Sequence, residues 1–272
     1  MFNVCGIYRD NSDYLTRHFI DQLNKAIDKF NNIHCYFYEN DSTDNTSELL
    51  LTRLKTRPTV LFECSCKPKI AREETNKRIE HLSYYRNRLL SLRPFTPSNE
   101  WTIFVDSNIY FDGHQCVGSL TALLELFLSR TYNNDVVGVC CNGKHSRECQ
   151  LHTTDQHKCF QYYDTYPLVY TDDTWVHREI SARSPFTCNW WFLQRENFMR
   201  FKHGEPVKVN SAFGGLSFYK TDVINKLTMC YKPTLWKNTQ HVMSEHVGFN
   251  EALREHGDLV VDPALIVFNK EG

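Results

Sequence analysis

The chain has 272 residues, of which 41% are hydrophobic and 14% are aromatic, which is enough apolar surface for one large core or two modest ones and argues against a disordered chain. Its 31 Lys and Arg residues balance 32 Asp and Glu residues, so no global field attracts nucleic acid or an acidic membrane, and nucleic acid is not an expected partner. No apolar run approaches the roughly 20 residues of a membrane span, and residues 1–5 lack the basic and apolar regions of a signal peptide. We therefore expect a soluble, cytoplasmic protein, or a soluble domain cut from a longer one.

Short strands and amphipathic helices alternate through the first half of the chain. Runs rich in apolar, aromatic and β-branched residues predict strands, and apolar residues that recur at helical spacing predict helices. The predicted strands span residues 4–8, 33–38, 59–62, 101–105 and 135–141, and the predicted helices span residues 15–30, 45–54, 72–92 and 119–129. This alternation predicts an α/β fold whose first half is a doubly wound, mainly parallel sheet flanked by helices.

The second half of the chain is less regular. Residues 142–206 contain many His, Asp and aromatic residues without clean periodicity, which is typical of a loop-rich active-site rim. Regular patterns return in residues 207–219, in a helical stretch at 244–256 and in apolar runs at 259–261 and 264–268. We expect this half to pack on the first half rather than to fold alone.

Two of the predicted strands end in polar turns that contain carboxylates. Residues 39–46 follow the second strand, and Asn45 with Glu48 forms a capping-box pattern that opens the next helix. Residues 106–108, Asp-Ser-Asn, follow the fourth strand. Because α/β proteins bind ligands at the carboxyl ends of their strands, the two turns suggest a nucleotide site and a metal site.

The order of these motifs along nearly the whole chain resembles that of a glycosyltransferase with the Rossmann-like GT-A fold, and most closely the capsule-associated mannosyltransferase-like group. The motifs that carry the resemblance are Glu39-Asn40-Asp41-Ser42-Thr43-Asp44-Asn45-Thr46, Tyr85-Arg86-Asn87-Arg88, Val105-Asp106-Ser107-Asn108, Tyr162-Tyr163-Asp164-Thr165, Ser211-Ala212-Phe213-Gly214-Gly215-Leu216 and Ser244-Glu245-His246-Val247-Gly248-Phe249-Asn250. The metal motif of such enzymes is usually Asp-x-Asp, and its third position here is Asn108. This departure leaves open whether metal dependence is kept.

The resemblance implies a single GT-A domain over residues 1–272. Residues 1–141 would bind the nucleotide sugar, and residues 142–272 would bind the acceptor. The implied activity is that of a hexosyl- or pentosyltransferase that moves a sugar from a UDP- or GDP-linked donor to a hydroxyl of a glycan or glycoconjugate, with Mn²⁺ or Mg²⁺ as cofactor. A nucleotide-sugar hydrolase that uses the same donor site and a non-catalytic module that binds nucleotide or glycan are the alternatives.

The candidate metal site follows from the chemistry of the leaving group. A nucleoside diphosphate leaves with negative charge, which a hard divalent cation with oxygen ligands can neutralise. Asp106 is the expected anchor, and Asn108 would lie on the same side if strand geometry persists. His246 could complete a Mn²⁺ site, because Mn²⁺ tolerates imidazole better than Mg²⁺ does. Ser107 belongs to the same donor segment; the alternative for the whole segment is an Asx turn that ends a strand.

Other candidate donor-binding residues lie in the first acidic turn, after the first strand and in a glycine pair. Glu39 and Asp41 could accept hydrogen bonds from the base or the ribose; the alternative is a turn in which Asp44 and Asn45 cap the next helix and Asp41 is solvated in the loop. Arg9 could neighbour the base or the pyrophosphate, although a lone Arg after a strand is more often a surface charge. Gly214 and Gly215 permit close passage of the backbone past a ligand, and a bulge or tight turn without a ligand is the alternative.

Two arginines lie near one face of the helix that precedes the metal strand. From Arg78 or Arg86, a guanidinium could bind a sugar hydroxyl, a phosphate or Asp106 itself. The alternative is a solvated basic helix. Arg86 ranks first because it occupies the place at which the resembling enzymes carry an arginine.

An inverting transferase needs a carboxylate that accepts the proton of the acceptor hydroxyl. Glu245 is the first candidate, because it begins a predicted helix after Ser244, a residue type that favours the N-cap position, and Asp164 is the second. The alternative for Glu245 is that it only stabilises the N-terminus of that helix.

Overall fold

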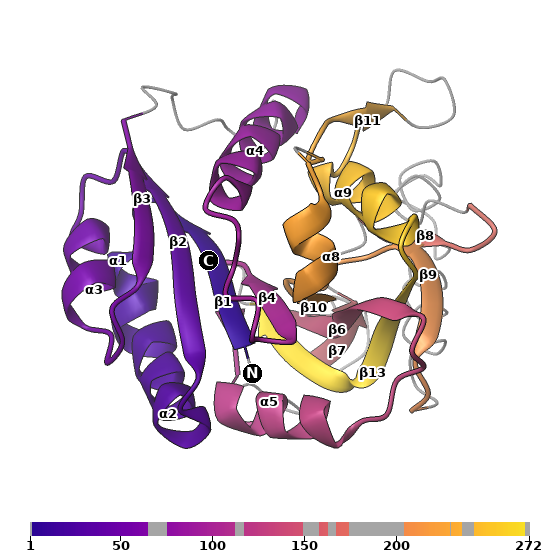
Figure 1. The fold of residues 1–272 in the computed structure, drawn as a ribbon, viewed down its shortest axis with the longest axis horizontal. Coiled ribbons are helices and arrows are strands. Elements are labelled where there is room, and N and C mark those ends of the chain that lie inside the picture. Colours follow the sequence, from indigo (N-terminus) through magenta and orange to yellow (C-terminus); the bar gives the residue numbers. More distant parts are fainter. Residues whose placement is uncertain are drawn as a thin grey trace.

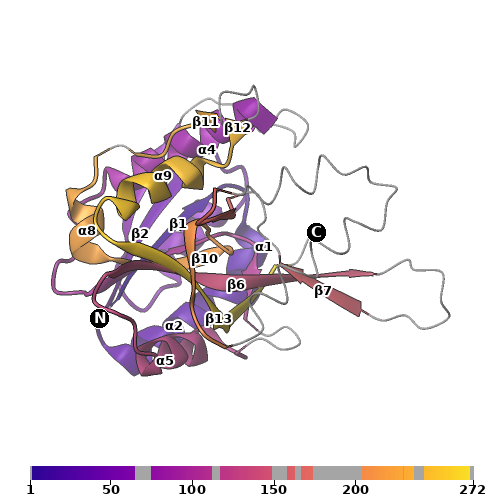
Figure 2. The ribbon, with the colours of Figure 1, turned by 90° about the vertical axis from the view of Figure 1, so that its right-hand side faces the viewer.

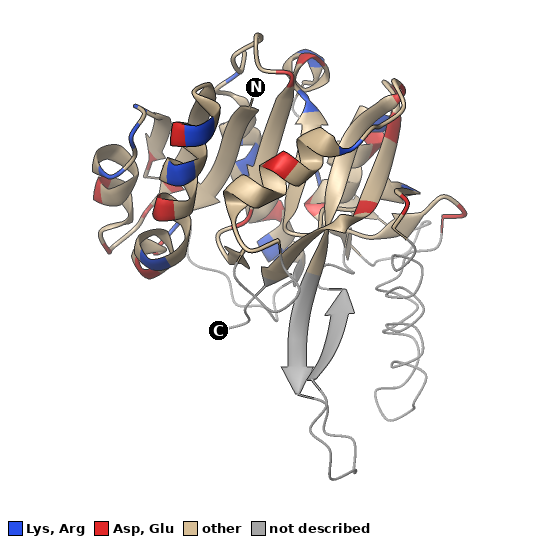
Figure 3. Ribbon diagram, turned by 90° about the horizontal axis from the view of Figure 1, so that it is seen from below, with Lys and Arg blue, Asp and Glu red and all other residues tan. Residues whose placement is uncertain are grey.

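A computed structural model describes most of the chain. The described residues are 2–64, 75–111, 117–148, 158–162, 167–173, 204–228, 230–235 and 242–269. Within these ranges, no helix has both the length and the apolar character needed to cross a membrane. Acidic and basic residues are interspersed over the described elements in the view of Figure 3, in keeping with the balanced composition.

The described strands form one large sheet and one small one (Figure 1). The strands of the large sheet are β1 (Phe2–Tyr8), β2 (Ile33–Asn40), β3 (Thr59–Glu63), β4 (Trp101–Val105), β5 (Ile109–Tyr110), β6 (Val136–Glu148), β7 (Lys158–Tyr162), β8 (Val169–Tyr170), β9 (Val207–Ser211), β10 (Leu216–Lys220) and β13 (Asp258–Asn269). Their order is β3-β2-β1-β4-β10-β6-β13-β9-β8, with β5 on β13 and β7 on β6. The small sheet pairs β11 (Thr234–Leu235) with β12 (Val242–Met243).

Most of the long strands run in one direction. Strands β3, β2, β1 and β4 are parallel neighbours, and β6 is parallel to β13. Strand β10 is antiparallel to both β4 and β6, and β9 is antiparallel to β13. Figure 2 shows β6 continuing beyond the body of the sheet to its antiparallel partner β7. The predicted mainly parallel sheet with flanking helices is therefore confirmed.

The helices cover both faces of the sheet. They are α1 (Ser12–Tyr14), the π-helical turn η1 (Leu15–Phe19), α2 (Ile20–Phe30), α3 (Thr46–Thr52), α4 (Thr75–Leu90), α5 (Leu120–Ser129), α8 (Thr221–Lys226) and α9 (Glu245–Arg254). One core contains side chains from α2, α3 and α5, and the other contains side chains from α4, α8 and α9. Alternation along β4 supplies both cores, because Ile103 and Val105 face the first and Phe104 faces the second.

The register of the parallel strands brings their carboxyl ends to one edge of the sheet. Gly6 of β1 is level with Val105 of β4, and Tyr8 is level with Glu39 of β2. The segments that follow β1, β2 and β4 therefore leave the sheet at the same edge, which is where an α/β sheet binds ligands.

One expectation about the sheet is wrong. The strand at 135–141 was predicted to complete the sheet of the first half, but β10, from the second half, lies between β4 and β6. Leu216 pairs with Val105, and Ser217 pairs with Cys140. The two halves of the chain therefore share one sheet. A contact between positions so far apart in sequence leaves no local pattern that would predict it.

The capping of α3 also differs from the prediction. The side chain of Asn45 makes no capping hydrogen bond. Instead, the backbone N–H of Thr46 donates to Asp44 Oδ1 at 3.0 Å, and the N–H of Ser12 donates to Asp44 Oδ2 at 2.9 Å. Burial raises the pKa of Asp44, but these hydrogen bonds outweigh burial and lower that pKa to about 2. Asp44 thus caps the helix and connects it to the loop after β1.

The two apolar runs near the C-terminal end form one strand, β13, with a register shift between Asp262 and Ile266. The fully buried Asp262 stabilises this irregularity. It accepts hydrogen bonds from Arg130 Nε at 2.8 Å, the Tyr132 hydroxyl at 2.8 Å and the Ala264 N–H at 2.9 Å. Arg130 Nη2 adds a contact to Oδ1 at 3.2 Å. We call Arg130, Tyr132 and Asp262 the Arg130 cluster.

Candidate active site

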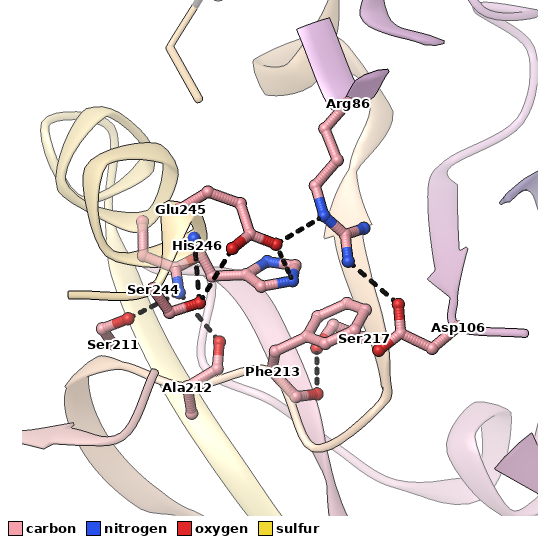
Figure 4. A network of polar contacts seen from close by, with 10 residues as sticks. Arg86, Asp106, Ser211, Ala212, Phe213, Ser217, Ser244, Glu245 and His246 are labelled. Carbon is pink, nitrogen blue, oxygen red and sulfur yellow. Dashed lines mark hydrogen bonds and ion pairs between the residues drawn. The ribbon is translucent and has the colours of Figure 1, made fainter. Parts of the chain in front are cut away.

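Three charged side chains from separate parts of the chain meet at the carboxyl edge of the sheet (Figure 4). Arg86 of α4 donates from Nε to Glu245 Oε1 and from Nη2 to Asp106 Oδ1, both at 2.9 Å. Asp106 directly follows β4, and Glu245 begins α9. The side chains of Arg86 and Glu245 are 6% and 5% exposed, whereas that of Asp106 is 24% exposed. Asp106 is therefore the open end of this Arg86 cluster.

Aromatic rings hold the guanidinium of Arg86 in place. Its Cζ atom lies 5.2 Å from the ring centroid of Phe213 and 5.7 Å from that of Tyr231, so both rings make cation–π contacts. The backbone of Tyr231 is in turn fixed by Asn87, which donates to its carbonyl at 2.7 Å and accepts from its N–H at 3.1 Å. Helix α4 thus supplies both the charge and, through Asn87, the position of a ring that covers it.

The charges of the Arg86 cluster do not balance. Burial raises the pKa of Asp106, Arg86 lowers it, Glu245 raises it again, and the net direction is upward. Burial alone would lower the pKa of Arg86, but Asp106 and Glu245 raise it above its ordinary value, so Arg86 stays protonated. One guanidinium faces two carboxylates, and with both carboxylates ionised the cluster has a net charge of −1.

His246 lies beside Glu245 on the inner side of the cluster. Its imidazole stacks on Phe213 at a centroid distance of 3.9 Å, and its Nε2 is 3.6 Å from Glu245 Oε1. Burial and the charge of Arg86 lower the pKa of His246 well below its usual value, so the ring is neutral. Its buried Nδ1 has no hydrogen-bond partner among the described residues. Among the described residues, the imidazole ring of His246 contacts Phe213, Tyr231 and Glu245, and its role as a metal ligand stays a prediction.

The glycine pair lies directly against Asp106. Gly214 and Gly215 have φ angles of +67° and +80°, which favour glycine. A Cβ atom on Gly214 would lie 2.0 Å from the carbonyl oxygen of Cys141, so no other residue fits there. The N–H of Asp106 donates to the carbonyl of Gly215 at 2.9 Å. The turn therefore needs its glycines for backbone packing, and close passage of a ligand stays a prediction.

The first acidic turn is organised by its own hydrogen bonds. Glu39 is buried, and its Oε1 accepts from the N–H of Ser42 at 3.0 Å. Asp41 has a φ of +53°, and its Oδ2 accepts from Asn40 Nδ2 at 3.1 Å. Asp10, in the loop after β1, accepts from the N–H of Thr43 at 2.8 Å. The loops after β1 and β2 are thus joined before any ligand binds.

The remaining predicted residues differ in position. Arg9 follows β1 and is half-buried, and its N–H donates to Asn11 Oδ1 at 3.0 Å. Arg78 is exposed on α4, but its charge lowers the pKa of Asp106. Ser107 and Asn108 form the half-buried turn between β4 and β5. Asp164, the second candidate base, lies outside the described residues.

Sequence reasoning missed two features of this edge. Glu63, the last residue of β3, accepts hydrogen bonds from the hydroxyls of Tyr38 and Tyr84 and from Arg88 Nε. A carboxylate at the end of a third parallel strand was the available signal. The second feature is Tyr231, whose ring covers Arg86; it lies in a segment without periodicity, so no pattern pointed to it.

The oxygen donors at this edge fit a hard divalent cation. Asp106 offers a partly exposed carboxylate within a cluster of net negative charge, and Asn108 lies two residues further on. Mg²⁺ and Mn²⁺ bind through one or two protein oxygens, with substrate phosphates and water completing the shell. In the described part of the chain, no group of three or more His, Cys, Asp or Glu side chains could hold a metal. A cation at this site would therefore bind only weakly to the protein alone, and substrate phosphates would tighten its binding.

Solved structures resemble the chain at low similarity. TarS from S. aureus (residues 1–349) has a TM-score of 0.45 and 15% sequence identity, and the match covers 99% of this chain and 60% of TarS. The mannosyltransferase PcManGT from Pyrobaculum calidifontis, solved with GDP-Man and Mn²⁺, has a TM-score of 0.46 and 9% identity, and the match covers 98% of this chain and 56% of PcManGT. GalNAc-T7, solved with UDP, GalNAc and Mn²⁺, has a TM-score of 0.49 and 11% identity, and the match covers 99% of this chain and 43% of GalNAc-T7. The chain thus spans 60% or less of the length of each, and a comparison with curated proteins found no match.

The family comparison is far more specific. The mainly parallel sheet, with the acidic turn after β2 and Asp106 after β4, has the arrangement expected of a GT-A glycosyltransferase. The family model described as Cryptococcal mannosyltransferase 1 matches residues 3–253. The chain belongs to this glycosyltransferase family, as its motif order predicted.

Proposed function

We propose that the protein transfers a hexosyl or pentosyl unit from a UDP- or GDP-linked donor to a hydroxyl of a glycan or glycoconjugate. The family description makes mannose the first sugar to test. The observation that carries the proposal is the position of Asp106, partly exposed at the end of β4 and held by Arg86 in a cluster that also contains Glu245.

The donor would lie along the carboxyl edge of the parallel strands. Its base and ribose would meet the first acidic turn, where Asp41 is half-buried and Glu39 supports the turn from within. The arginines at positions 9 and 78 would offer positive charge to its phosphates. The segment 106–108 would bind the diphosphate end, with the glycine turn behind it. This division agrees with a nucleotide-sugar role for residues 1–141 and an acceptor role for residues 142–272, although β10 joins the two halves in one sheet.

We assign the cation, Mn²⁺ or Mg²⁺, to Asp106 and Asn108. When bound, it would neutralise the negative charge that develops on the leaving diphosphate. The protein would hold the donor in place through the carboxylate of Asp106, the amide of Asn108 and the backbone turn at residues 214–215, which is hydrogen-bonded to Asp106. His246 is a weaker candidate, because its ring is packed between Phe213 and Glu245.

In an inverting reaction, the acceptor oxygen forms a bond to the anomeric carbon as the bond from that carbon to the phosphate oxygen breaks. The nucleoside diphosphate leaves with the electron pair, and the hydroxyl proton passes to a carboxylate. Glu245 is the described carboxylate we assign to this step, with Asp164 as the second candidate. Because the side chain of Glu245 is only 5% exposed, binding of the acceptor must open access to it.

A donor screen tests the proposal. The purified chain is incubated with GDP-mannose and with other GDP- and UDP-linked sugars, with Mn²⁺ or EDTA, and the released nucleoside diphosphate is measured with and without a panel of glycan acceptors. We expect release from one donor that an acceptor stimulates, that EDTA removes and that Asp106→Ala abolishes. Glu251→Gln, on the exposed side of α9, is the matched control and should retain activity.

The other outcomes point to the other functions. Equal release with and without every acceptor, with free sugar as the product, would indicate a hydrolase. Nucleotide binding that ignores Mn²⁺ and leads to no turnover would indicate a binding module. If no nucleotide binds, the proposal is wrong.

A further inference from the structure

Arg86 is held as a rigid bridge between two carboxylates that belong to different parts of the proposed reaction. Its Nε contacts Glu245, and its Nη2 contacts Asp106. The rings of Phe213 and Tyr231 limit the movement of the guanidinium. One carboxylate would already balance the charge of Arg86, whereas this guanidinium contacts two.

The exposure of the three side chains shows where a further charge can enter. Glu245 and Arg86 are almost completely buried, so solvent and ions reach the cluster through Asp106. The carboxylate of Asp106 is engaged by Arg86 through Oδ1. A cation that binds Asp106 must therefore bind next to a fixed positive charge, which opposes it, and within reach of the negative charge of Glu245, which favours it.

We propose that Arg86 is a built-in counter-cation that competes with the divalent cation for Asp106, and that Glu245 sets the strength of this competition by neutralising Arg86 from its far side. The proposal rests on the assignment of the cation to Asp106. In this proposal Arg86 is a positioning residue, because it holds the carboxylate of Asp106 before the cation binds and limits how tightly the cation binds. It also couples the cation site to the proposed base, and such coupling acts equally in both directions.

The charge of the cluster makes a prediction for each variant. The wild-type cluster has a net charge of −1. Glu245→Gln makes it 0, Arg86→Gln makes it −2, and the double variant restores −1. If the competition is electrostatic, Arg86→Gln should bind Mn²⁺ most tightly and Glu245→Gln most weakly. Wild type and the double variant should bind Mn²⁺ equally, with an affinity between these two. We expect each step to change the dissociation constant about 5-fold, since these are close charges in a partly solvated site.

The experiment measures binding of Mn²⁺ alone to the full chain, by the electron paramagnetic resonance signal of free Mn²⁺, with no donor or acceptor present. Glu251→Gln removes one exposed carboxylate from the same helix and should leave the dissociation constant within about 2-fold. Asp106→Asn should remove the site. Thermal melting of each variant shows whether it is folded.

The order of affinities decides the outcome. If Arg86 only builds the site, Arg86→Gln weakens Mn²⁺ binding, and the proposal is wrong; it is also wrong if Glu245→Gln binds as wild type does, or if wild type binds no Mn²⁺. Should Arg86→Gln fail to fold, the double variant must still bind more tightly than Glu245→Gln. A correct order combined with no turnover of any donor would overturn the proposed transferase and leave this inference standing.

Discussion

Two of the arginine clusters in the described part of the chain look alike in outline and differ in charge. In the Arg130 cluster one guanidinium meets one carboxylate, and both oxygens of Asp262 accept hydrogen bonds, from Arg130, Tyr132 and the N–H of Ala264. In the Arg86 cluster one guanidinium meets two carboxylates, and one of these reaches solvent. The first cluster is complete without a ligand, and the second has negative charge in excess.

This difference in net charge distinguishes a cluster that stabilises the fold from one that is suited to bind a charged ligand. A buried charge is tolerated when its partner and its remaining hydrogen bonds are present, which describes Asp262. Two carboxylates that share one guanidinium are costly unless a further positive charge compensates them. The unbalanced cluster is therefore the place to which we assign the cation and the charged substrate in our proposal, and the balanced cluster stabilises the register shift in β13.

The largest expected effect is on turnover at the unbalanced cluster. Asp106→Ala should lower the rate of nucleoside diphosphate release at least about 1000-fold, because it removes the anchor of a cation that contributes several kcal/mol to the reaction. Its melting temperature should change by only a few degrees, since Asp106 is partly exposed. Steady-state kinetics and thermal melting check both parts. A rate near that of wild type would move the site elsewhere.

The proposed base should affect turnover at saturating Mn²⁺ far more than it affects donor binding. Glu245→Gln keeps the size of the side chain and its acceptor for Arg86 but cannot take a proton, so kcat should fall on the order of 100-fold. The KM for the donor should change much less. Steady-state kinetics over a range of donor concentrations separates the two parameters. Unchanged kcat would shift the assignment to Asp164.

The balanced cluster should respond in the opposite way. Asp262→Ala leaves Arg130 and the bulge without their partner and should lower the free energy of unfolding by about 3 kcal/mol, at the low end for buried pairs because the Arg130 side chain is 26% exposed. The kcat of the folded fraction should stay within about 3-fold. Urea denaturation measures the stability. Glu100→Ala, which breaks the exposed pair with Lys220, is the control and should cost less than about 1 kcal/mol.

The smallest effect tests the turn beside the site. Asp44→Ala should destabilise the protein by about 1 kcal/mol at pH 7, the usual value of a helix cap, whereas Asn45→Ala should change stability far less. Because the pKa of Asp44 is lowered to about 2 in the folded chain, its contribution is complete above about pH 4 and is lost as the pH falls toward 2. Urea denaturation at pH 7, 4 and 3 should show the two variants converging, and equal effects at pH 7 would return the cap to Asn45.

Local patterns in the sequence were enough for the parallel strands and most helices. Nearly continuous apolar residues mark β1, β2 and β4 because these strands are buried on both faces, whereas β3, at the edge of the sheet, is only partly buried and is marked by its β-branched and aromatic residues. The place of β10 could not be predicted, since its pairing with β4 depends on contacts between residues more than 100 positions apart.

In the candidate site, too, the residues with a local signal could be predicted from the sequence, and the contacts between distant residues could not. Asp106 could be found because a carboxylate after a buried strand is a local signal. The sequence also singled out Arg86 and named Asp106 as a possible partner, but it could not predict the burial of Arg86, because the groups that surround it, among them Glu245, come from distant parts of the chain. The sequence placed both Asp44 and Asn45 at the start of α3, but it could not show that Asp44 makes the capping hydrogen bond, because that geometry depends on the loop after β1.

The measurement that tests the central claim most directly is calorimetric binding of GDP and of UDP to wild type and to Asp106→Ala, each with Mn²⁺ and with EDTA. We predict that wild type binds one of the two nucleotides at least about 10-fold more tightly with Mn²⁺, and that Asp106→Ala loses this difference. Equal enhancement by Mn²⁺ in both proteins would contradict the assignment of the cation and the donor to the Arg86 cluster.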